Sequence, residues 1–251
     1  MTHSSLTVRS LVPALVMVCA MGLAAPAAAQ DGAVLLRVRP AVGQEFVWTA
    51  VMKTEAVSAV GEFQMDMSLT QQVLARTEKD LTWSMKTAIT QVAAKGVFAG
   101  IESVLRSMDG KEMTKVVDLT GQTTRLTLDG QDVPASGTPD VTFPEKAVAP
   151  GESWIASVDA GAGRKANIRY TFKGRSTASG GAASLLIEGV YEPNQSVKSI
   201  EPTIFHLDPA DCTPISASGV MEANFDGKIL RSRFNVTRTS VKASPKPAPK
   251  D

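Results

Sequence analysis

Residues 62–70 read EFQMDMSLT, and this stretch decides the fold class because its apolar and polar residues alternate strictly. Phe63, Met65, Met67 and Leu69 occupy every second position, with Gln, Asp and Ser between them. Successive side chains of a β-strand point to opposite faces, so the stretch predicts a strand with one apolar and one polar face. One-sided alternation favours an antiparallel sheet over a parallel sheet that is buried on both faces.

The same alternation continues across short polar turns. The segment RTEKD (76–80) precedes LTWSMKTAITQVA (81–93), in which Leu81, Trp83 and Met85 share the apolar side. Two such runs joined by a short charged turn predict a long hairpin. Further hairpins are predicted for MTKVVDLTGQTTRLTLDG (113–130), for NIRYTFKGR (167–175) with AASLLIEGVY (182–191) across STASGG (176–181), and for GVMEANFDGKILRSRFNV (219–236) around Asp226-Gly227.

Helical periodicity is rare in this chain. In FAGIESVLRSMDG (98–110), Ile101, Val104, Leu105 and Met108 have helical spacing, and Gly110 is a stop signal. A second, weaker helix candidate lies within NQSVKSIEPTIFHLD (194–208), limited by Pro202. The sequence therefore predicts a mostly β protein with one or two short helices.

Two segments of the chain nearly repeat each other. LRVRPAVGQEFVWTA (36–50) and FPEKAVAPGESWIAS (143–157) both place a glycine, then Gln or Glu, then an aromatic residue that opens an apolar run. Gly43 and Gly151 lie 108 residues apart, and Trp48 and Trp154 lie 106 apart. The turn glycines of two predicted hairpins, Gly121 and Gly227, are also 106 apart.

This spacing suggests an internal duplication into two strand-rich halves, about 34–135 and 140–240. The halves would extend one curved antiparallel sheet, or half-barrel, or else face each other as two sheets. The simpler alternative is that glycine followed by an aromatic residue is a common way to enter a strand, because glycine permits a tight turn and the aromatic ring supplies apolar area for packing.

The ends of the chain differ from its body. Residues 1–29 combine a basic start with Arg9, an apolar run, and small residues at the −3 and −1 positions, Ala27 and Ala29, which is typical of a cleaved signal peptide. Cys19 lies inside the apolar run without the small residue before it that a lipidated cysteine requires. We therefore expect a periplasmic or secreted protein without an integral membrane span after cleavage. Residues 30–241 form a single predicted domain, and the tail KASPKPAPKD (242–251) is predicted to be disordered.

Charge and cysteine content narrow the function classes. The whole chain has 26 basic and 25 acidic residues, and removal of Arg9 with the signal leaves an even balance. Since no basic patch is visible, no nucleic-acid partner is expected. The mature chain retains one cysteine, Cys212, so it cannot form an internal disulfide. In an oxidising compartment this thiol must be buried, inert or intermolecular, and we expect it to be buried.

The candidates for catalysis are few. His206, Asp208, Asp211 and Cys212 lie close together in FHLDPADC (205–212), but this spacing lacks the paired ligands of zinc sites and fits a loop equally well. Ser153 in GES lacks a nucleophile elbow, so a Ser-His-Asp triad is not supported. Paired carboxylates of the glycosidase type are left open, since 25 acidic residues are scattered along the chain. We predict no catalytic residue, no metal ligand and no cofactor, and the binding residues are not identified.

Sulfur and aromatic side chains offer two further alternatives. Met52, Met65, Met67 and Met85 suggest thioether binding of copper(I), but methionine is more often a flexible core filler. Asp66, between two methionines, falls on the predicted polar face, where it is solvated. The tryptophans are similarly expected in the core rather than around a ligand. They are Trp48, Trp83 and Trp154.

The order of several segments resembles a bacterial family of exported proteins of unknown function. A phrase P-x-x-x-V-x-x-G-x-S-W is present here as Pro144, Val148, Gly151, Ser153 and Trp154. The family looks similar to periplasmic lipoprotein carriers, whose curved antiparallel sheets enclose a hydrophobic cavity, so the resemblance implies a lipid-like ligand. The segments that carry the resemblance are LRVRPAVGQEFVWTAVMKTE (36–55), MDGKEMTKVVDLTGQTTRL (108–126), FPEKAVAPGESW (143–154) and ASGVMEANFDGKILRS (217–232).

We therefore expect a non-catalytic binding or carrier protein for an apolar, lipid-like ligand. A carrier predicts a continuous internal cavity lined by the alternating apolar residues. The alternative is a structural or interaction protein of the cell envelope with a fully packed core, which predicts an exposed apolar patch or an unpaired edge strand. A hydrolytic enzyme is the third alternative. The protein partners are unknown.

Overall fold

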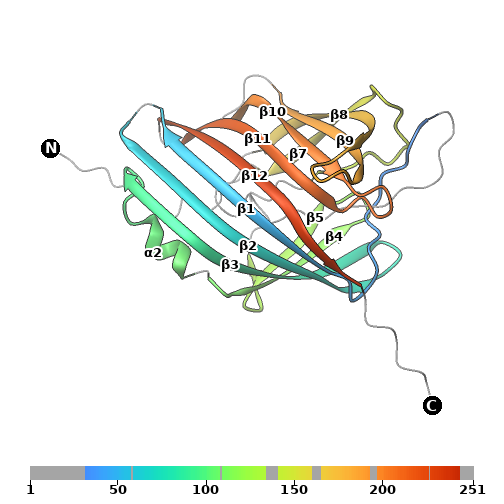
Figure 1. The fold of residues 1–251 in the computed structure, drawn as a ribbon, viewed down its shortest axis with the longest axis horizontal. Helices are drawn as coiled ribbons and strands as arrows, with labels where there is room; N and C mark the ends of the chain where they lie inside the picture. Colours follow the sequence, from blue (N-terminus) through green and yellow to red (C-terminus); the bar gives the residue numbers. More distant parts are fainter. Residues whose placement is uncertain are drawn as a thin grey trace, which may run out of the picture.

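Twelve strands and one short helix make up the described part of this computed structural model (Figure 1). The described residues are 32–57, 59–107, 109–133, 141–159, 165–192, 197–225 and 227–243. The predicted signal peptide and residues 244–251 of the predicted tail (242–251) lie outside them, whereas Lys242 is the last residue of a strand. The elements are β1 (Glu45–Ala56), β2 (Gly61–Arg76), β3 (Asp80–Gly96), α2 (Ile101–Arg106), β4 (Glu112–Asp118), β5 (Thr123–Leu128), β6 (Gln131–Val133), β7 (Ser153–Asp159), β8 (Lys165–Thr177), β9 (Ala183–Tyr191), β10 (Val197–Leu207), β11 (Pro214–Phe225) and β12 (Lys228–Lys242).

The strands form one antiparallel sheet in the order β6-β5-β4-β3-β2-β1-β12-β11-β10-β9-β8-β7. Each half of the chain is a meander of six strands, and the two meanders join where β1 pairs with β12. Figure 1 shows β3, β2, β1 and β12 in front of β4 and β5, so the sheet is strongly curved. The outermost strands, β6 and β7, do not pair with each other within the described ranges, which leaves the sheet open. The prediction of a mostly β protein with a curved antiparallel sheet is confirmed.

Alternating burial shows why the sequence gives this sheet. In β2, Phe63, Met65, Met67 and Leu69 are buried, whereas the residues between them are only partly buried. Met65 lies opposite Met52 of β1, and Met67 lies opposite Ala50, so the apolar residues of neighbouring strands meet on one face. We call this the inner face, and the opposite, polar one the outer face.

The repeated phrase forms the same turn twice. The turns span residues 41–44 and 149–152, and the third residue of each is a glycine with positive φ, 80° at Gly43 and 90° at Gly151. The following side chain closes the turn, since Gln44 Oε1 accepts from Ala41 N at 3.0 Å and a Glu152 carboxylate oxygen accepts from Ala149 N at 2.7 Å. Each glycine N–H also bonds the carbonyl of the next strand, at Val73 and at Phe172. The phrase is therefore a side-chain-closed turn that starts β1 and β7, and the duplication of the halves stays a prediction.

We expect Gly151→Ala to lower the free energy of unfolding by about 1–2 kcal/mol, because a residue with a Cβ resists the left-handed conformation. A Cβ at this position would meet no atom within 4 Å, so the cost is purely conformational. Denaturant unfolding measures the effect. Glu152→Gln is the matched control, because it keeps an accepting oxygen as Gln44 does, and it should stay close to the wild type. An unchanged midpoint for Gly151→Ala would contradict the role given to this turn.

Two connecting segments fill one end of the inner face. Residues 33–40 precede β1 and residues 141–148 precede β7, and Val34 and Val148 pair with each other across them. Leu36 and Val38 are completely buried in the same apolar cluster as the strands. Val38 N donates to Leu119 O, which ties the first segment to the turn between β4 and β5. The two halves therefore share one core.

One predicted helix is present and one is not. The helix α2 starts after Gly100, which has a φ of 95°, and buries Ile101 and Leu105 against the core. The weaker candidate in 194–208 is wrong, because the described part of this segment forms strand β10, Val197–Leu207. Pro202 lies within a shifted stretch of the β10–β11 register, where a residue without an N–H costs no ladder bond. Alternation of Val197, Phe205 and Leu207 on the inner face outweighs the helical pattern.

Candidate functional site

A small apolar recess lies on the inner face of the second half. Five neighbouring strands, β8 to β12, supply its walls, and no charged side chain lines it. Its cavity volume is about 20 Å³, which is the space of about one water molecule. The lining residues are Ile168, Tyr170, Gly189, Tyr191, Thr203, Phe205, Met221 and Phe234.

Two glycines set the shape of this recess. Gly189 lies opposite Tyr170 in the β8–β9 pair, and a Cβ on it would lie 3.1 Å from the tyrosine ring. Gly219 lies opposite Phe234 in the β11–β12 pair, where a Cβ would lie 3.3 Å from the phenylalanine ring. The missing side chains therefore let both rings pack down onto the sheet, and the recess is the space that remains between them.

A row of aromatic rings connects the recess with the open edge of the sheet. Phe205 contacts Tyr170 at a centroid distance of 6.2 Å, and Tyr170 stacks on Trp154 at 5.6 Å. Trp154 belongs to the edge strand β7 and lies 6.5 Å from Phe143 of the segment 141–148. The Trp154 indole donates to Thr142 O at 2.7 Å, so it fastens that segment to the sheet edge.

The residues of the loop FHLDPADC have separate partners. His206 lies on β10, and its Nδ1 is 2.9 Å from Ser184 Oγ, while partial burial lowers the pKa of the imidazole. Asp208 pairs with Arg238 at 2.8 Å, and Asp211 accepts from the backbone and the hydroxyl of Thr213. In the described part of the chain, no three His, Cys, Asp or Glu side chains gather as metal ligands would. The loop instead stabilises the start of β11.

Cys212 is completely buried, as the sequence predicted. Burial is the main cause that raises the pKa of its thiol, so the group stays protonated at neutral pH. We expect a thiol reagent to label Cys212 in the folded protein only at the rate of unfolding, and rapidly in denaturant. Fast labelling of the native protein at neutral pH would contradict this position.

The methionines and tryptophans are core residues, with one exception. Met52, Met65, Met67 and Met85 are buried on the inner face of β1, β2 and β3. Trp48 and Trp83 are about 1% exposed, and in the described residues no hydrogen-bond partner faces Trp83 Nε1. The exception is Trp154, which is only half-buried at the sheet edge. Asp66 lies on the outer face as predicted, where its carboxylate accepts from Gln64 at 3.2 Å.

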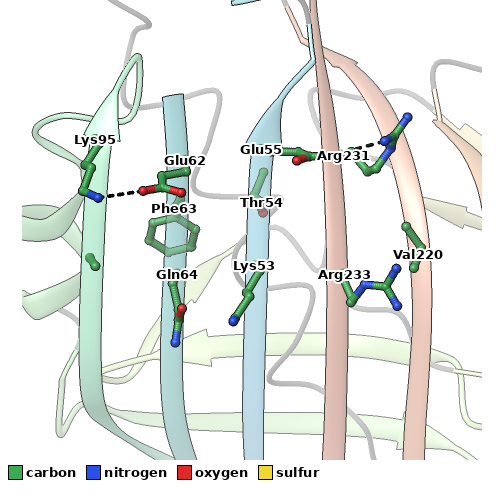
Figure 2. A pocket seen from close by; sticks show the side chains of 11 residues that line it. Lys53, Thr54, Glu55, Glu62, Phe63, Gln64, Lys95, Val220, Arg231 and Arg233 are labelled. Atoms are coloured by element: carbon green, nitrogen blue, oxygen red, sulfur yellow. Dashed lines mark hydrogen bonds and ion pairs between the residues drawn. The ribbon is translucent and has the colours of Figure 1, made fainter. Parts of the chain in front are cut away.

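A larger hollow lies on the outer face, where β3, β2, β1, β12 and β11 run side by side (Figure 2). Its volume is about 550 Å³, and its walls carry mostly charged side chains. We call it the outer groove. Its lining residues are Lys53, Thr54, Glu55, Glu62, Phe63, Gln64, Ala93, Lys95, Val220, Arg231 and Arg233.

Comparisons with known proteins found matches among solved structures only. No family model matches the chain, and no curated protein sequence matches it. A structure of lipovitellin and its lipid–protein interactions covers 84% of the chain at 10% identity and a TM-score of 0.44, and the chain spans only 26% of its length.

Two bacterial structures cover 80% of the chain, which spans 85% of each. One is described as an outer membrane lipoprotein-sorting protein domain from Vibrio parahaemolyticus, with 11% identity and a TM-score of 0.28. The other is a DUF1329 family protein from Desulfovibrio piger, with 9% identity and a TM-score of 0.30. No helix in the described ranges is long and apolar enough to span a bilayer.

Sequence reasoning missed both hollows. The recess depends on rings and glycines from five strands, and only the alternation in NIRYTF (167–172) marked any of them as inner-face residues. The outer groove depends on which strands become neighbours, and the pairing of β1 with β12 was not apparent in the sequence. The one available signal was the regular occurrence of charges on the polar sides of these strands.

Proposed function

We propose that this exported protein is a non-catalytic carrier that binds an apolar, lipid-like ligand on its inner face, in the periplasm or outside the cell. The observation that supports the proposal is the uncharged, aromatic-rich recess on the inner face, which a row of aromatic rings connects with the open edge of the sheet. Apolar walls with few polar groups are typical of sites for small apolar ligands.

The size of the recess sets a condition on this function. Ligand pockets usually measure about 300–1,000 Å³, far more than the recess offers in this conformation. An apolar ligand must therefore displace protein atoms as it enters. Two parts of the protein lie at the sheet edge, namely the segment 141–148 and the ring of Trp154. We propose that the apolar ligand enters between these parts and β8.

The first test is native mass spectrometry of the protein purified from its own host. We expect an additional bound mass that organic extraction identifies as a lipid. The second test titrates a fluorescent fatty acid into the protein and into two variants of Met221, a partly buried residue of the recess wall. Met221→Trp should weaken binding because the larger side chain fills the recess, whereas the volume-conserving Met221→Leu should bind like the wild type.

The alternative is a structural or interaction protein of the envelope. The close packing around the recess favours it. So does the outer edge of strand β7, which pairs only with β8 in the described ranges, because edge strands offer backbone groups to a partner chain. In that case the wild type carries no bound mass and the fatty acid does not bind, which would overturn the carrier proposal.

A further inference from the structure

Two basic residues occupy opposite positions in the register of the central strand pair of the outer groove. Lys53 of β1 lies directly opposite Arg233 of β12 in the antiparallel register. Their chain neighbours Met52 and Phe234 are buried on the inner face, so Lys53 and Arg233 both project from the outer face. Like charges directly opposite each other destabilise a sheet, because such pairs have Cβ atoms only about 5 Å apart. This arrangement therefore calls for an explanation.

The other cations of the outer groove have carboxylate partners. Arg231 pairs with Glu55 at 3.2 Å and with Glu222, and Lys95 pairs with Glu62 at 2.7 Å. These three ion pairs therefore leave neither Glu55 nor Glu62, the acids that line the groove, free for Lys53.

Lys53 itself has no such partner. Arg233 reaches Glu201 on the far side at 3.3 Å, whereas the side chain of Lys53 makes no hydrogen bond or ion pair with any described residue. Figure 2 shows Arg233 leaning toward β11, and Lys53 leaning away from it. Gln64 is the residue of β2 opposite Lys53, and Asp66, two positions further along β2, accepts a hydrogen bond from Gln64. The groove thus contains an uncompensated positive charge beside a second cation.

We propose that the outer groove binds the oxyanion of a phosphate ester between Lys53 and Arg233. An arginine presents a planar fork of N–H donors to a phosphate, and a lysine adds a mobile point charge. An anion between them would remove the repulsion that the register imposes. A groove of about 550 Å³ is larger than an ion, so the ester carries an organic body that lies along Gln64 and Val220.

This site is independent of the proposed carrier function. The outer groove and the apolar recess lie on opposite faces of the sheet, so the inference stands whether or not a lipid binds inside. The same phosphate ester can come from two sources, a free metabolite-sized ester or the headgroup of a lipid in a membrane surface. The experiment separates them by using one probe for each.

The full chain is titrated with glycerol 3-phosphate by calorimetry, and is sedimented with phosphatidylcholine vesicles that contain or lack phosphatidylglycerol. We expect the wild type to show saturable binding to at least one probe. Lys53→Met and Arg233→Gln should each lower the affinity about ten-fold, which is equivalent to about 1.4 kcal/mol. Lys86→Met is the matched control, since Lys86 is exposed on the outer face of β3 but does not line the groove. It should bind like the wild type.

Thermal unfolding without phosphate provides a second readout. Lys53→Met should raise the melting temperature, because it removes the repulsion from Arg233, even while it weakens binding. A lysine with only a structural role would lower the melting temperature when removed.

Binding to glycerol 3-phosphate alone identifies a free ester, and binding to vesicles alone identifies a headgroup. If the wild type binds neither probe, or if Lys53→Met binds as tightly as the wild type, the inference is overturned.

Discussion

Replacing Trp48 by alanine is expected to lower the free energy of unfolding by about 3–5 kcal/mol, the range for removal of a large buried aromatic side chain. Trp48 is about 1% exposed and stacks on Phe46 at a centroid distance of 5.4 Å. Its indole also points to Pro214 O of the second half, at 3.4 Å. The variant therefore leaves a cavity where the two halves meet.

Denaturant unfolding followed by fluorescence and circular dichroism measures this loss. Because the halves share one core, we expect both probes to show a single transition that shifts as a whole. Val51→Ala is the control on the same strand, since Val51 is 39% exposed on the outer face and its loss should cost about 0.5 kcal/mol or less. Two separate transitions, with only one of them shifted, would contradict the single-domain prediction.

The second large effect is expected for Gly96→Ala, at about 2–5 kcal/mol. Gly96 ends β3 with a φ of 63°, and a Cβ on it would lie 2.1 Å from Val60 O and 2.8 Å from Gly61 Cα. Both contacts are with backbone, so no side-chain rotation relieves them. This cost is the sum of two contributions: about 1–2 kcal/mol for a residue with a Cβ in the left-handed conformation, and about 1–3 kcal/mol for overpacking.

This position matters because the chain leaves β3 here to place α2 on the inner face. Phe98 packs against Phe63 at 6.2 Å, and Ile101 begins the helix. Gly100→Ala is the matched control, since Gly100 also has a positive φ but a Cβ on it would meet nothing within 4 Å. The difference between the two variants in urea unfolding isolates the clash. Equal stability of the two variants would show that the backbone yields easily at Gly96.

Much of the fold could be predicted from local pattern. Alternation in the stretches around Met65, Trp83 and Phe234 predicted strands and the faces they bury, because side-chain direction in a strand follows from the backbone alone. Short polar turns predicted most of the hairpins, since their ends are neighbours in sequence. The exception was β10, where the sequence offered a weak helix candidate limited by Pro202, and pairing with β9 and β11 made the segment a strand.

The candidate sites were beyond the reach of the sequence for a different reason. The recess needs Gly189 beneath Tyr170, and the outer groove needs Lys53 opposite Arg233, which lies 180 residues further along the chain. No local pattern reports such a pairing. The buried position of Cys212 was predicted because a lone thiol in an oxidising compartment is best kept from solvent.

By itself, the amino-acid sequence determined most of the strands other than β10, their apolar sides and the two glycine turns before β1 and β7, because each depends on residues that lie close together in the chain. The tertiary structure decided that β1 pairs with β12, that the segments 33–40 and 141–148 fill the inner face, and how large each hollow is. The physical reason is that register and packing join residues distant in sequence, and a sheet that remains open at β6 and β7 can satisfy the same local pattern in more than one strand order.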